Sequence, residues 1–589
     1  MLSFLLLPAL VALEQASARV VEPTATHLPG ATVSGSALPT SSPTPVLSPN
    51  FPALGALPRR YQASDLERLW DVVGPVEPPP FTTTRVPQTP VALPSAPPAL
   101  YPSWYSPAPK DLLPKYKFPK GFKFGVATAA YQVEGAVRDE GKGPTMWDWN
   151  SRQPGGVTDN TTGDVVDLHY FLYKEDVARI AALGVNAHSF SISWARIFPF
   201  GTADSPVNQA GLDHYSDLIN YHSKLGVEPV ATLFHWDVPL ALQAYYGGFT
   251  SPNIVDDFVH YAKTVFRAYN GRVKTWYTFN EPRVYCGQLK GYPFNVNFAP
   301  GVNATSAPFH CAYNLLKAHA GAVKAFREMK IQGEISFKND DYVGLAWRAN
   351  NTEDAEAVER HAAFQIGIFS DPVYKGDWPQ RMKDTLTPDV LPRFTEAEKK
   401  DILGSADFYA IDPYRTQYIT APSGGIKACV SDPSHELWPS CNTPVQYDSN
   451  AGWAAGWTPD PLMDWLQATP NFLVDSLKEL KRRWPYKKIY VSEFGFAEPT
   501  EGSRTDLFRI TEDFERTNYF MTYLGEILRG IHEENLPIAG AFAWAMVDNT
   551  EWSSGTSARF GIQYVNYTSL ERHYKRSALA LSEFWKAHN

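Results

Sequence analysis

The chain has 589 residues, of which 44% are hydrophobic and 14% aromatic, and its formal net charge is -9 at pH 7. This length accommodates one large barrel or several smaller domains, and the hydrophobic content suffices for an extensive core. The acidic balance, without any concentrated basic segment, excludes a nucleic-acid-binding protein, because phosphate binding needs a positively charged face. The many aromatic residues are typical of a large core or of a sugar-stacking surface.

The first 18 residues have the features of a secretory signal peptide. An apolar run over residues 1–13 is too short to span a bilayer, and small residues follow it at 16–18, as in a cleavage site. No other apolar run reaches spanning length. We therefore expect an exported protein, secreted or associated with the cell wall, without stable membrane insertion. Four N-glycosylation sequons, at Asn160, Asn303, Asn350 and Asn566, agree with this location.

Residues 19–115 form a Pro-, Ser- and Thr-rich extension. The stretch 21–120 holds 22 of the chain's 49 prolines and shows little hydrophobic periodicity. Such a segment buries too little apolar surface to offset the entropy lost on ordering, so we expect a disordered linker or stalk. A propeptide or wall-attachment segment is the alternative. Within it, residues 61–73 have the pattern of a short helix that would be marginal by itself.

Residues 116–589 alternate between predicted strands and predicted amphipathic helices. We expect strands at 123–128, 187–193, 228–234, 274–280, 334–338, 408–411, 488–492 and 539–543, and helices at 173–183, 212–225, 253–269, 307–329 and 517–533. Eight strand–helix units fit an α/β fold, a single (β/α)8 TIM barrel with long βα loops. A doubly wound sheet is the alternative, but it predicts a phosphate-binding glycine turn after the first strand, where this chain has the sequence AAYQVEG.

Four cysteines, at 286, 311, 429 and 441, allow three disulfide connectivities in an oxidising compartment. Proximity in the sequence favours Cys286 with Cys311 and Cys429 with Cys441. The spacing fits no zinc pattern. Buried free thiols are the alternative for the first pair.

Two glutamates stand at the tips of predicted strands that are distant in the sequence. Glu281 follows strand 274–280 in the motif TFNEP, and Glu493 follows strand 488–492 in the motif SEFG. Barrel enzymes carry their chemistry at the C-terminal ends of strands. Two carboxyl groups in different environments can cleave a glycosidic bond, and their separation decides between retention and inversion at the anomeric carbon.

Both motifs resemble those of the family 1 glycoside hydrolases, the β-glucosidase family, whose second motif usually reads TENG. The resemblance covers roughly residues 116–586. It implies a retaining double displacement with Glu281 as acid/base and Glu493 as nucleophile. Charge coupling between them is then expected to raise the pKa of Glu281 while Glu493 stays ionised.

The resemblance also implies partners for the two glutamates, each with an ordinary structural role as its alternative. Asn280 matches the residue that holds the sugar 2-hydroxyl, Arg196 the arginine that pairs with the nucleophile, and Tyr414 its hydrogen-bonding tyrosine. The family pattern DFxGxNxYT is altered here, because Asp412 stands where asparagine is usual. This additional acid either shifts the pH optimum or is paired by Arg415.

The sugar-binding set is implied in the same way. The matching positions are Gln132, His235, Trp236, Trp544, Glu551, Trp552 and Phe560. Polar side chains would bind hydroxyls while aromatic planes stack on the sugar ring, although core packing is the alternative for the tryptophans and a satisfied buried group for the polar residues. Trp457 is expected to line the aglycone subsite. Phe494 and Ser492 replace the usual Asn and Thr beside the nucleophile, which is expected to move Glu493 slightly.

The motifs also narrow the substrate. Phosphosugar members of the family carry Ser, Lys and Tyr where this chain has Glu551, Ala558 and Phe560, and a carboxylate would repel a phosphate. Thioglucosidase relatives lack the acid/base glutamate, which is present here. We expect a β-glucosidase acting on cellobiose-like, cello-oligosaccharide and aryl β-glucosides, as in cellulose degradation, without metal or cofactor. The alternatives are a β-galactosidase or broad β-glycosidase, and a catalytically silent glycan- or protein-binding barrel.

Overall fold

The computed structural model describes residues 51–87, 91–95, 115–340, 344–448 and 452–589, which fall within one compact unit, Thr44–Asn589. The predicted signal peptide, 1–18, lies outside the described residues. Within them, no helix combines the length and apolarity needed to cross a membrane.

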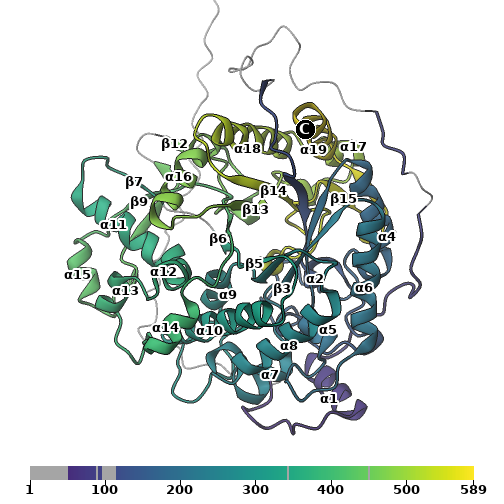
Figure 1. The fold of residues 1–589 in the computed structure, drawn as a ribbon, viewed down its shortest axis with the longest axis horizontal. Coiled ribbons are helices and arrows are strands. Elements are labelled where there is room, and N and C mark those ends of the chain that lie inside the picture. The colour runs from purple at the N-terminus through teal and green to yellow at the C-terminus, as the bar shows by residue number, and fades with distance from the viewer. Residues whose placement is uncertain (1–50, 88–90, 96–114, 341–343, 449–451) are drawn as a thin grey trace, which may run out of the picture. The chain divides into compact units, whose positions relative to one another are not determined.

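A parallel sheet curls into a barrel at the centre of the molecule (Figure 1). Its strands are β1 (Lys123–Ala127), β2 (Ala187–Ser191), β3 (Glu228–Phe234), β4 (Thr275–Phe279), β5 (Glu334–Ser336), β6 (Asn339–Asp340), β8 (Tyr409–Asp412), β13 (Ile489–Phe494) and β14 (Ile538–Trp544). Neighbouring strands follow the order β5-β4-β3-β2-β1-β14-β13-β8-β6. The predicted α/β barrel is confirmed, with each expected strand present at close to its expected position.

The barrel closes through an interrupted strand. Only Phe337 and Lys338 separate β5 from β6. β5 pairs in parallel with β4, whereas β6 pairs in parallel with β8. The segment 334–340 therefore serves as the fifth of the eight barrel strands. Phe337 and Lys338, at its break, have no regular strand pairing with β8.

Helices form the outer layer of the barrel. The long ones that follow successive strands are α4 (His169–Ala182), α6 (Gln209–Lys224), α8 (Ile254–Tyr269), α10 (Ala307–Glu328), α16 (Leu473–Arg483), α18 (Phe514–His532) and α19 (Arg576–His588). The other helices are α1 (Ala63–Val73), α2 (Ala130–Val133), α3 (Met146–Asn150), α5 (Trp194–Ile197), α7 (Leu240–Tyr246), α9 (Pro282–Gln288), α11 (Thr352–Ala362), α12 (Ile368–Lys375), α13 (Gln380–Thr385), α14 (Glu396–Ile402), α15 (Ile426–Val430) and α17 (Leu507–Thr511).

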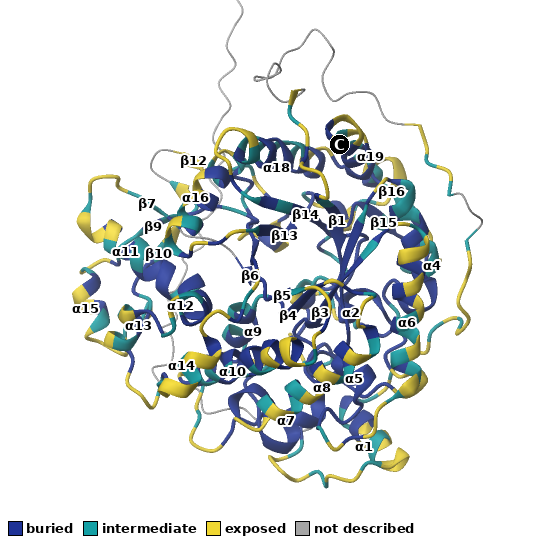
Figure 2. Cartoon of the chain, viewed as in Figure 1, coloured by how far each residue is buried: buried dark blue, intermediate teal, exposed yellow. Residues whose placement is uncertain are grey.

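Helix α8 illustrates why these stretches fold as they do. Asp256 and Asp257 lie in its first turn and Arg267 in its last, which complements the helix dipole. Phe258 and Tyr261 lie on its buried face, while the strands beneath it are buried on both sides (Figure 2). Parallel strands covered by helices read as nearly continuous apolar runs, which is why the sequence located them well.

Short strands extend the loops beyond the barrel. A three-stranded sheet joins β7 (Leu345–Ala346), β9 (Tyr418–Thr420) and β10 (Thr443–Val445), and two hairpins pair β11 (Tyr447–Asp448) with β12 (Trp453–Ala454) and β15 (Gln563–Val565) with β16 (Arg572–Tyr574). Both predicted disulfides are present, Cys286–Cys311 between α9 and α10 and Cys429–Cys441 between α15 and the start of β10. The first joins α9 to the barrel helix α10, and the second closes a short loop between β9 and β10.

The Pro-rich extension differs from the sequence expectation, because residues 51–87 contact the barrel. Helix α1, drawn in purple at the lower edge of Figure 1, buries Leu69, Trp70 and Val73. The Trp70 indole N–H donates to the carbonyl of Lys142 at 3.2 Å. The expectation of disorder over 19–115 therefore does not hold for residues 51–87. The sequence does not reveal this packing, because a short helix in a Pro-rich stretch is marginal by itself. Here it is stabilised by a surface that only the folded barrel provides.

Residues on both sides of α1 are also held. The Phe51 ring meets that of Trp149 edge-on, with centroids 4.8 Å apart. Tyr61 donates to Asp204 at 2.6 Å, and the backbone N–H of Glu77 donates to Asp164 at 2.9 Å. Residues 51–87 thus pack against the barrel domain and form part of it.

The substitution Trp70→Ala tests this packing. It would empty a buried site and remove a hydrogen bond, so we expect the free energy of unfolding to fall by about 3 to 5 kcal/mol. Urea-induced unfolding followed by tryptophan fluorescence measures the change. Val86→Ala, at a side chain that is 70% exposed, serves as the control and is expected to have no effect. An unchanged urea midpoint for Trp70→Ala would contradict the packing.

Candidate active site

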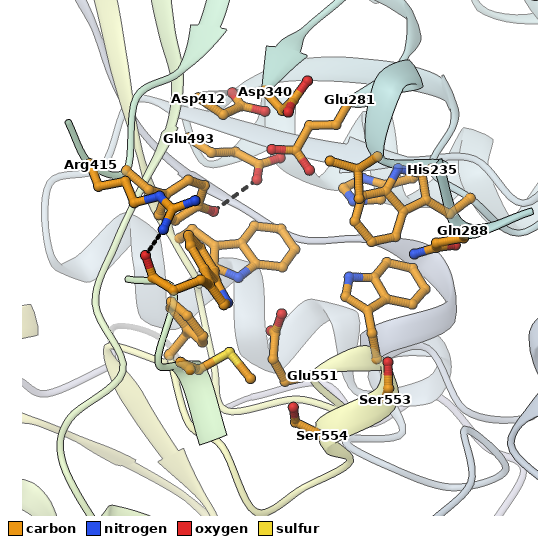
Figure 3. A pocket seen from close by; sticks show the side chains of 18 of the residues that line it. His235, Glu281, Gln288, Asp340, Asp412, Arg415, Glu493, Glu551, Ser553 and Ser554 are labelled. Carbon is orange, nitrogen blue, oxygen red and sulfur yellow. Dashed lines mark hydrogen bonds between the residues drawn. The ribbon is translucent and has the colours of Figure 1, made fainter. Parts of the chain in front are cut away.

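A cavity of about 440 Å³ opens at the C-terminal ends of the barrel strands (Figure 3). Among the residues expected from the sequence, it is lined by His235, Trp236, Glu281, Tyr414, Glu493, Trp544, Glu551, Trp552 and Phe560. These residues come from the ends of β3, β4, β8, β13 and β14 and from the loop that follows β14. Its size and its mixture of aromatic and polar side chains suit a small ligand of amphipathic character.

The two strand-tip glutamates meet in this cavity. One carboxyl oxygen from each of Glu281, Asp412 and Glu493 can be chosen so that all three lie within 4.8 Å of one another. Glu281 adopts a left-handed backbone conformation, with φ of 39°, between β4 and Pro282 at the start of α9. The turn there directs its side chain across the mouth of the barrel toward Glu493, as Figure 3 shows.

Glu493 is held by two donors. The Tyr414 hydroxyl donates to its Oε2 at 3.0 Å, and the Lys338 ammonium donates to its Oε1 at 2.8 Å. The pairing with Tyr414 is the one implied by the resemblance. Lys338 was not among the predicted site residues, although it ends the predicted strand 334–338. A charged residue at a strand tip facing two acids was the available signal.

Arg196 does not pair with Glu493 as the resemblance implies. Its Nε donates to Glu134 at 3.0 Å, and its guanidinium lies 3.9 Å from the centroid of the Tyr170 ring. Both charged groups are buried and belong to the segments that follow β1 and β2, and neither lines the cavity. The prediction was wrong because the motif places Arg196 on α5, one step beyond the strand end, where Glu134 is the nearer carboxylate.

Asp412 adds a third carboxyl group to the centre. Its Oδ1 accepts a hydrogen bond of 2.6 Å from Ser492, and its Oδ2 has no hydrogen-bond partner among the described residues. Burial, followed by the charge of Glu493, raises the pKa of Asp412 well above its ordinary value, while Lys338 acts in the opposite direction. The raised pKa favours the neutral form of Asp412, and whether this residue shifts the pH optimum stays a prediction. Arg415 donates to the carbonyl of Trp465.

The acidity of Glu281 follows from the same surroundings. Burial raises its pKa well above the ordinary glutamate value, and the neighbouring carboxylates of Asp412, Glu493 and Asp340 raise it further. Arg283 opposes this effect and itself donates to Asp340 at 2.7 Å. The raised pKa favours a protonated Glu281, whereas Glu493 has a cationic partner. This difference suits Glu281 to the role of acid and Glu493 to that of nucleophile.

Polar and aromatic groups converge at the other end of the cavity. Burial raises the pKa of Glu551 to about 8, with the charge of Glu493 adding to the shift, so Glu551 can donate as well as accept. Gln132 lies behind it and donates to its Oε2 at 3.4 Å. The His235 ring lies near-parallel to the rings of both Trp544 and Trp552, with both centroid distances 5.8 Å.

Burial, followed by the charge of Lys338, keeps His235 neutral by holding its pKa well below the ordinary value. The buried side-chain amide of Asn280, next to Glu281, forms no hydrogen bond with any described residue. An amide with both atoms unsatisfied is costly unless a ligand completes it. Asn280 is therefore available for a hydroxyl group, although it does not line the main cavity surface.

Trp457 is not among the residues that line this cavity, contrary to the sequence expectation. It packs beside Phe496, with ring centroids 6.1 Å apart. Trp465, which is 37% exposed, lies at the cavity mouth with Leu462 and Met463. The two tryptophans are eight positions apart in one long loop, and sequence alone offered no means of choosing between them.

The three clustered oxygens of Glu281, Asp412 and Glu493 would also be close enough to surround a metal ion. The Lys338 ammonium, however, already provides positive charge at 2.8 Å from Glu493. A cation is therefore built into the chain at this point. The expectation that no metal or cofactor takes part stays a prediction.

Comparison with known proteins agrees with this geometry. Residues 114–589 match the model of glycosyl hydrolase family 1. Beta-glucosidase 25 of Oryza sativa subsp. japonica is 35% identical over 478 residues, which cover 78% of this chain and 91% of that protein. The furostanol glycoside 26-O-beta-glucosidase of Hellenia speciosa is 37% identical over 512 residues, covering 84% and 86%.

Solved structures give the same result. A GH1 beta-glucosidase from the fungus Humicola insolens in complex with glucose superimposes with a TM-score of 0.74 at 35% identity, covering 80% of this chain and 98% of that chain. The beta-glucosidase from Trichoderma harzianum gives a TM-score of 0.73 at 35% identity, with the same coverage.

Proposed function

Because this chain belongs to glycosyl hydrolase family 1, we propose that it is a retaining β-glucosidase that releases terminal β-D-glucosyl residues from cellobiose-like and aryl β-glucosides. One observation carries the proposal: carboxyl oxygens of Glu281 and Glu493 lie within 4.8 Å of each other. Retaining glycosidases hold their two carboxyl groups about 5 to 5.5 Å apart, whereas inverting ones leave room for a water molecule between them.

In the first step, Glu493 attacks the anomeric carbon while Glu281 transfers its proton to the glycosidic oxygen. The C–O bond to the aglycone breaks, and a covalent bond to the carboxylate of Glu493 forms. Tyr414 and Lys338 donate to the two oxygens of Glu493 and thereby fix its orientation. Because its pKa is raised, Glu281 keeps the proton that it transfers in this step at near-neutral pH.

In the second step, Glu281 has lost its proton and acts as a base. It removes a proton from a water molecule, whose oxygen attacks the anomeric carbon and displaces Glu493. The second inversion restores the original β configuration. Glu281 and Glu493 thus return to their starting protonation states, so no cofactor is consumed.

The glucosyl unit is proposed to bind at the end of the cavity that holds Glu551, His235 and Trp544. Hydrogen bonds from these polar groups would select the hydroxyls, and the indole would cover the apolar face of the ring. The relatives named as beta-glucosidases support glucose as the sugar. Glu551, able to donate or accept, also leaves a 4-hydroxyl of either orientation acceptable, so galactosides belong in the substrate test.

We further propose export of the enzyme and glycosylation of its surface. The sequon residues Asn160, Asn303 and Asn350 are exposed, and Asn566 is partly exposed. Two disulfides agree with an oxidising compartment. Secretion into culture medium, with an endoglycosidase-sensitive mass, would test this location.

The pair Glu493→Ala and Glu281→Ala tests the assigned roles. We expect Glu493→Ala to lower kcat/KM for dinitrophenyl β-glucoside by at least about 10,000-fold with the melting temperature nearly unchanged. Azide should then restore product as the α-glucosyl azide, whereas with Glu281→Ala azide should yield the β-glucosyl azide. NMR of the products distinguishes the two anomers. Full activity of Glu493→Ala without azide, or of Glu281→Ala on cellobiose, whose leaving group needs a proton, would refute the roles. Inactivity of the wild-type enzyme on a panel of glucosides and galactosides would refute the proposed function.

Asp412→Asn tests the origin of the raised pKa of Glu281. Glu281 must carry its proton to act as the acid, so activity falls as the pH rises through its pKa. The amide keeps the shape and the acceptor for Ser492, but it cannot become negatively charged as the pH rises. A charge on Asp412 would raise the pKa of Glu281, so we expect the basic limb of kcat/KM in the variant to move to lower pH by about 1 unit. A basic limb that stays in place would show that Asp412 does not contribute to the raised pKa of Glu281.

A further inference from the structure

Lys338 lies at the break between β5 and β6, where it contacts both halves of the site. Its backbone N–H donates to the carbonyl of Phe279 at 3.0 Å, and its carbonyl accepts from the N–H of Glu281 at 3.1 Å. Its side chain reaches the opposite wall and donates to Glu493 at 2.8 Å. One residue therefore holds the acid by its main chain and the nucleophile by its side chain.

The ammonium of Lys338 is buried, with 1% of its side chain exposed. The Tyr277 ring lies beneath it, with the centroid 5.2 Å from Nζ, so the charge has a cation–π partner as well as a carboxylate. The titratable groups that face this centre are Glu281 after β4, Asp340 on β6, Asp412 on β8, Tyr414 after β8, Glu493 on β13 and His235 after β3.

We propose that Lys338 is a positioning residue of the reaction, whose ammonium keeps Glu493 ionised against the neighbouring acids. Three carboxyl groups in one low-dielectric cavity cannot all be charged. With one ammonium present, the favourable state holds one carboxylate and two neutral acids. The direct contact of Lys338 with Glu493 decides that the carboxylate is the nucleophile. This inference rests on the proposed function, because it assigns how the nucleophile of that reaction is maintained.

The arginines near the site have other principal partners. Arg196 is bound to Glu134, and Arg283 donates to Asp340. Arg415 lies against Trp465 at the cavity mouth. Lys338 is a cation in direct contact with the nucleophile, the role that the resemblance assigned to Arg196.

The experiment compares the pH dependence of kcat/KM for Lys338→Met, Lys338→Arg and the wild type. Loss of the cation makes Glu493 easier to protonate, so we expect the acid limb of Lys338→Met to move to higher pH by about 1 to 3 units. Arginine keeps the charge, so we expect the acid limb of Lys338→Arg to stay within about 0.5 unit of the wild type, with a lower kcat because its planar group is larger.

Lys142→Met provides the matched control. Lys142 is another buried lysine, 3.1 Å from Asp148 and not among the residues lining the cavity. Its loss should lower the melting temperature without moving the acid limb. A shift equal to that of Lys338→Met would overturn the proposal, because general destabilisation would then explain both.

Folding of the variants is checked by circular dichroism and thermal melting. If Lys338→Met does not fold, the double variant Lys338→Met/Asp412→Asn is compared with Asp412→Asn alone, because it removes one acid together with the cation. Its acid limb is again expected at higher pH.

The inference would be overturned if Lys338→Met folds and the acid limb of its kcat/KM profile lies at the same pH as in the wild type. The proposed function would survive that result if Glu493→Ala remained inactive. Conversely, an inactive wild-type enzyme would reject the function itself.

Discussion

The active site depends on how the barrel closes next to β4, where β5 and β6 together form one interrupted strand. There, the backbone N–H of Glu281 donates to the carbonyl of Lys338 at 3.1 Å, which holds the acid in place. The side chain of Lys338 reaches across the cavity to Glu493 on β13. A regular strand at this position would direct alternate side chains toward the helices. Lys338 keeps this alternation across the break. Its neighbours Phe337 and Asn339 contact residues of α10 and α12, whereas Lys338 itself faces Glu493 in the cavity.

Electrostatic neutrality explains the remaining features of the site. Burial makes each additional charge costly, so the acids share few negative charges among them. The raised pKa values of Glu281, Asp412 and Glu551 all have burial as their largest cause, with other carboxylates adding to it. The same balance explains why Asp412 is tolerated beside the nucleophile: as a neutral acid it accepts from Ser492 without placing a second negative charge there.

The sequence predicted the barrel and the glutamates well because both leave local signals. Buried parallel strands are apolar runs bounded by polar loops, and Glu281 and Glu493 sit at the ends of two of them. Arg196 and Trp457 were misassigned because their partners are set by side-chain direction and loop path, which no local pattern encodes. The helix α1 was recognised only as marginal, since its stability comes from contacts of Trp70 with residues such as Lys142, distant in the chain.

Lys338 marks the limit of reasoning by motif. A carboxylate nucleophile needs a nearby positive charge and donors of suitable direction, but it does not need them from one particular strand. In a barrel, all eight strand ends face the same cavity, so the cation expected from Arg196 on α5 can be replaced by one that the segment 334–340 supplies. What the chemistry constrains is the total charge around Glu493. For that reason, a substitution such as Asp412 is interpretable only together with Lys338, and the two positions should be treated as one electrostatic unit.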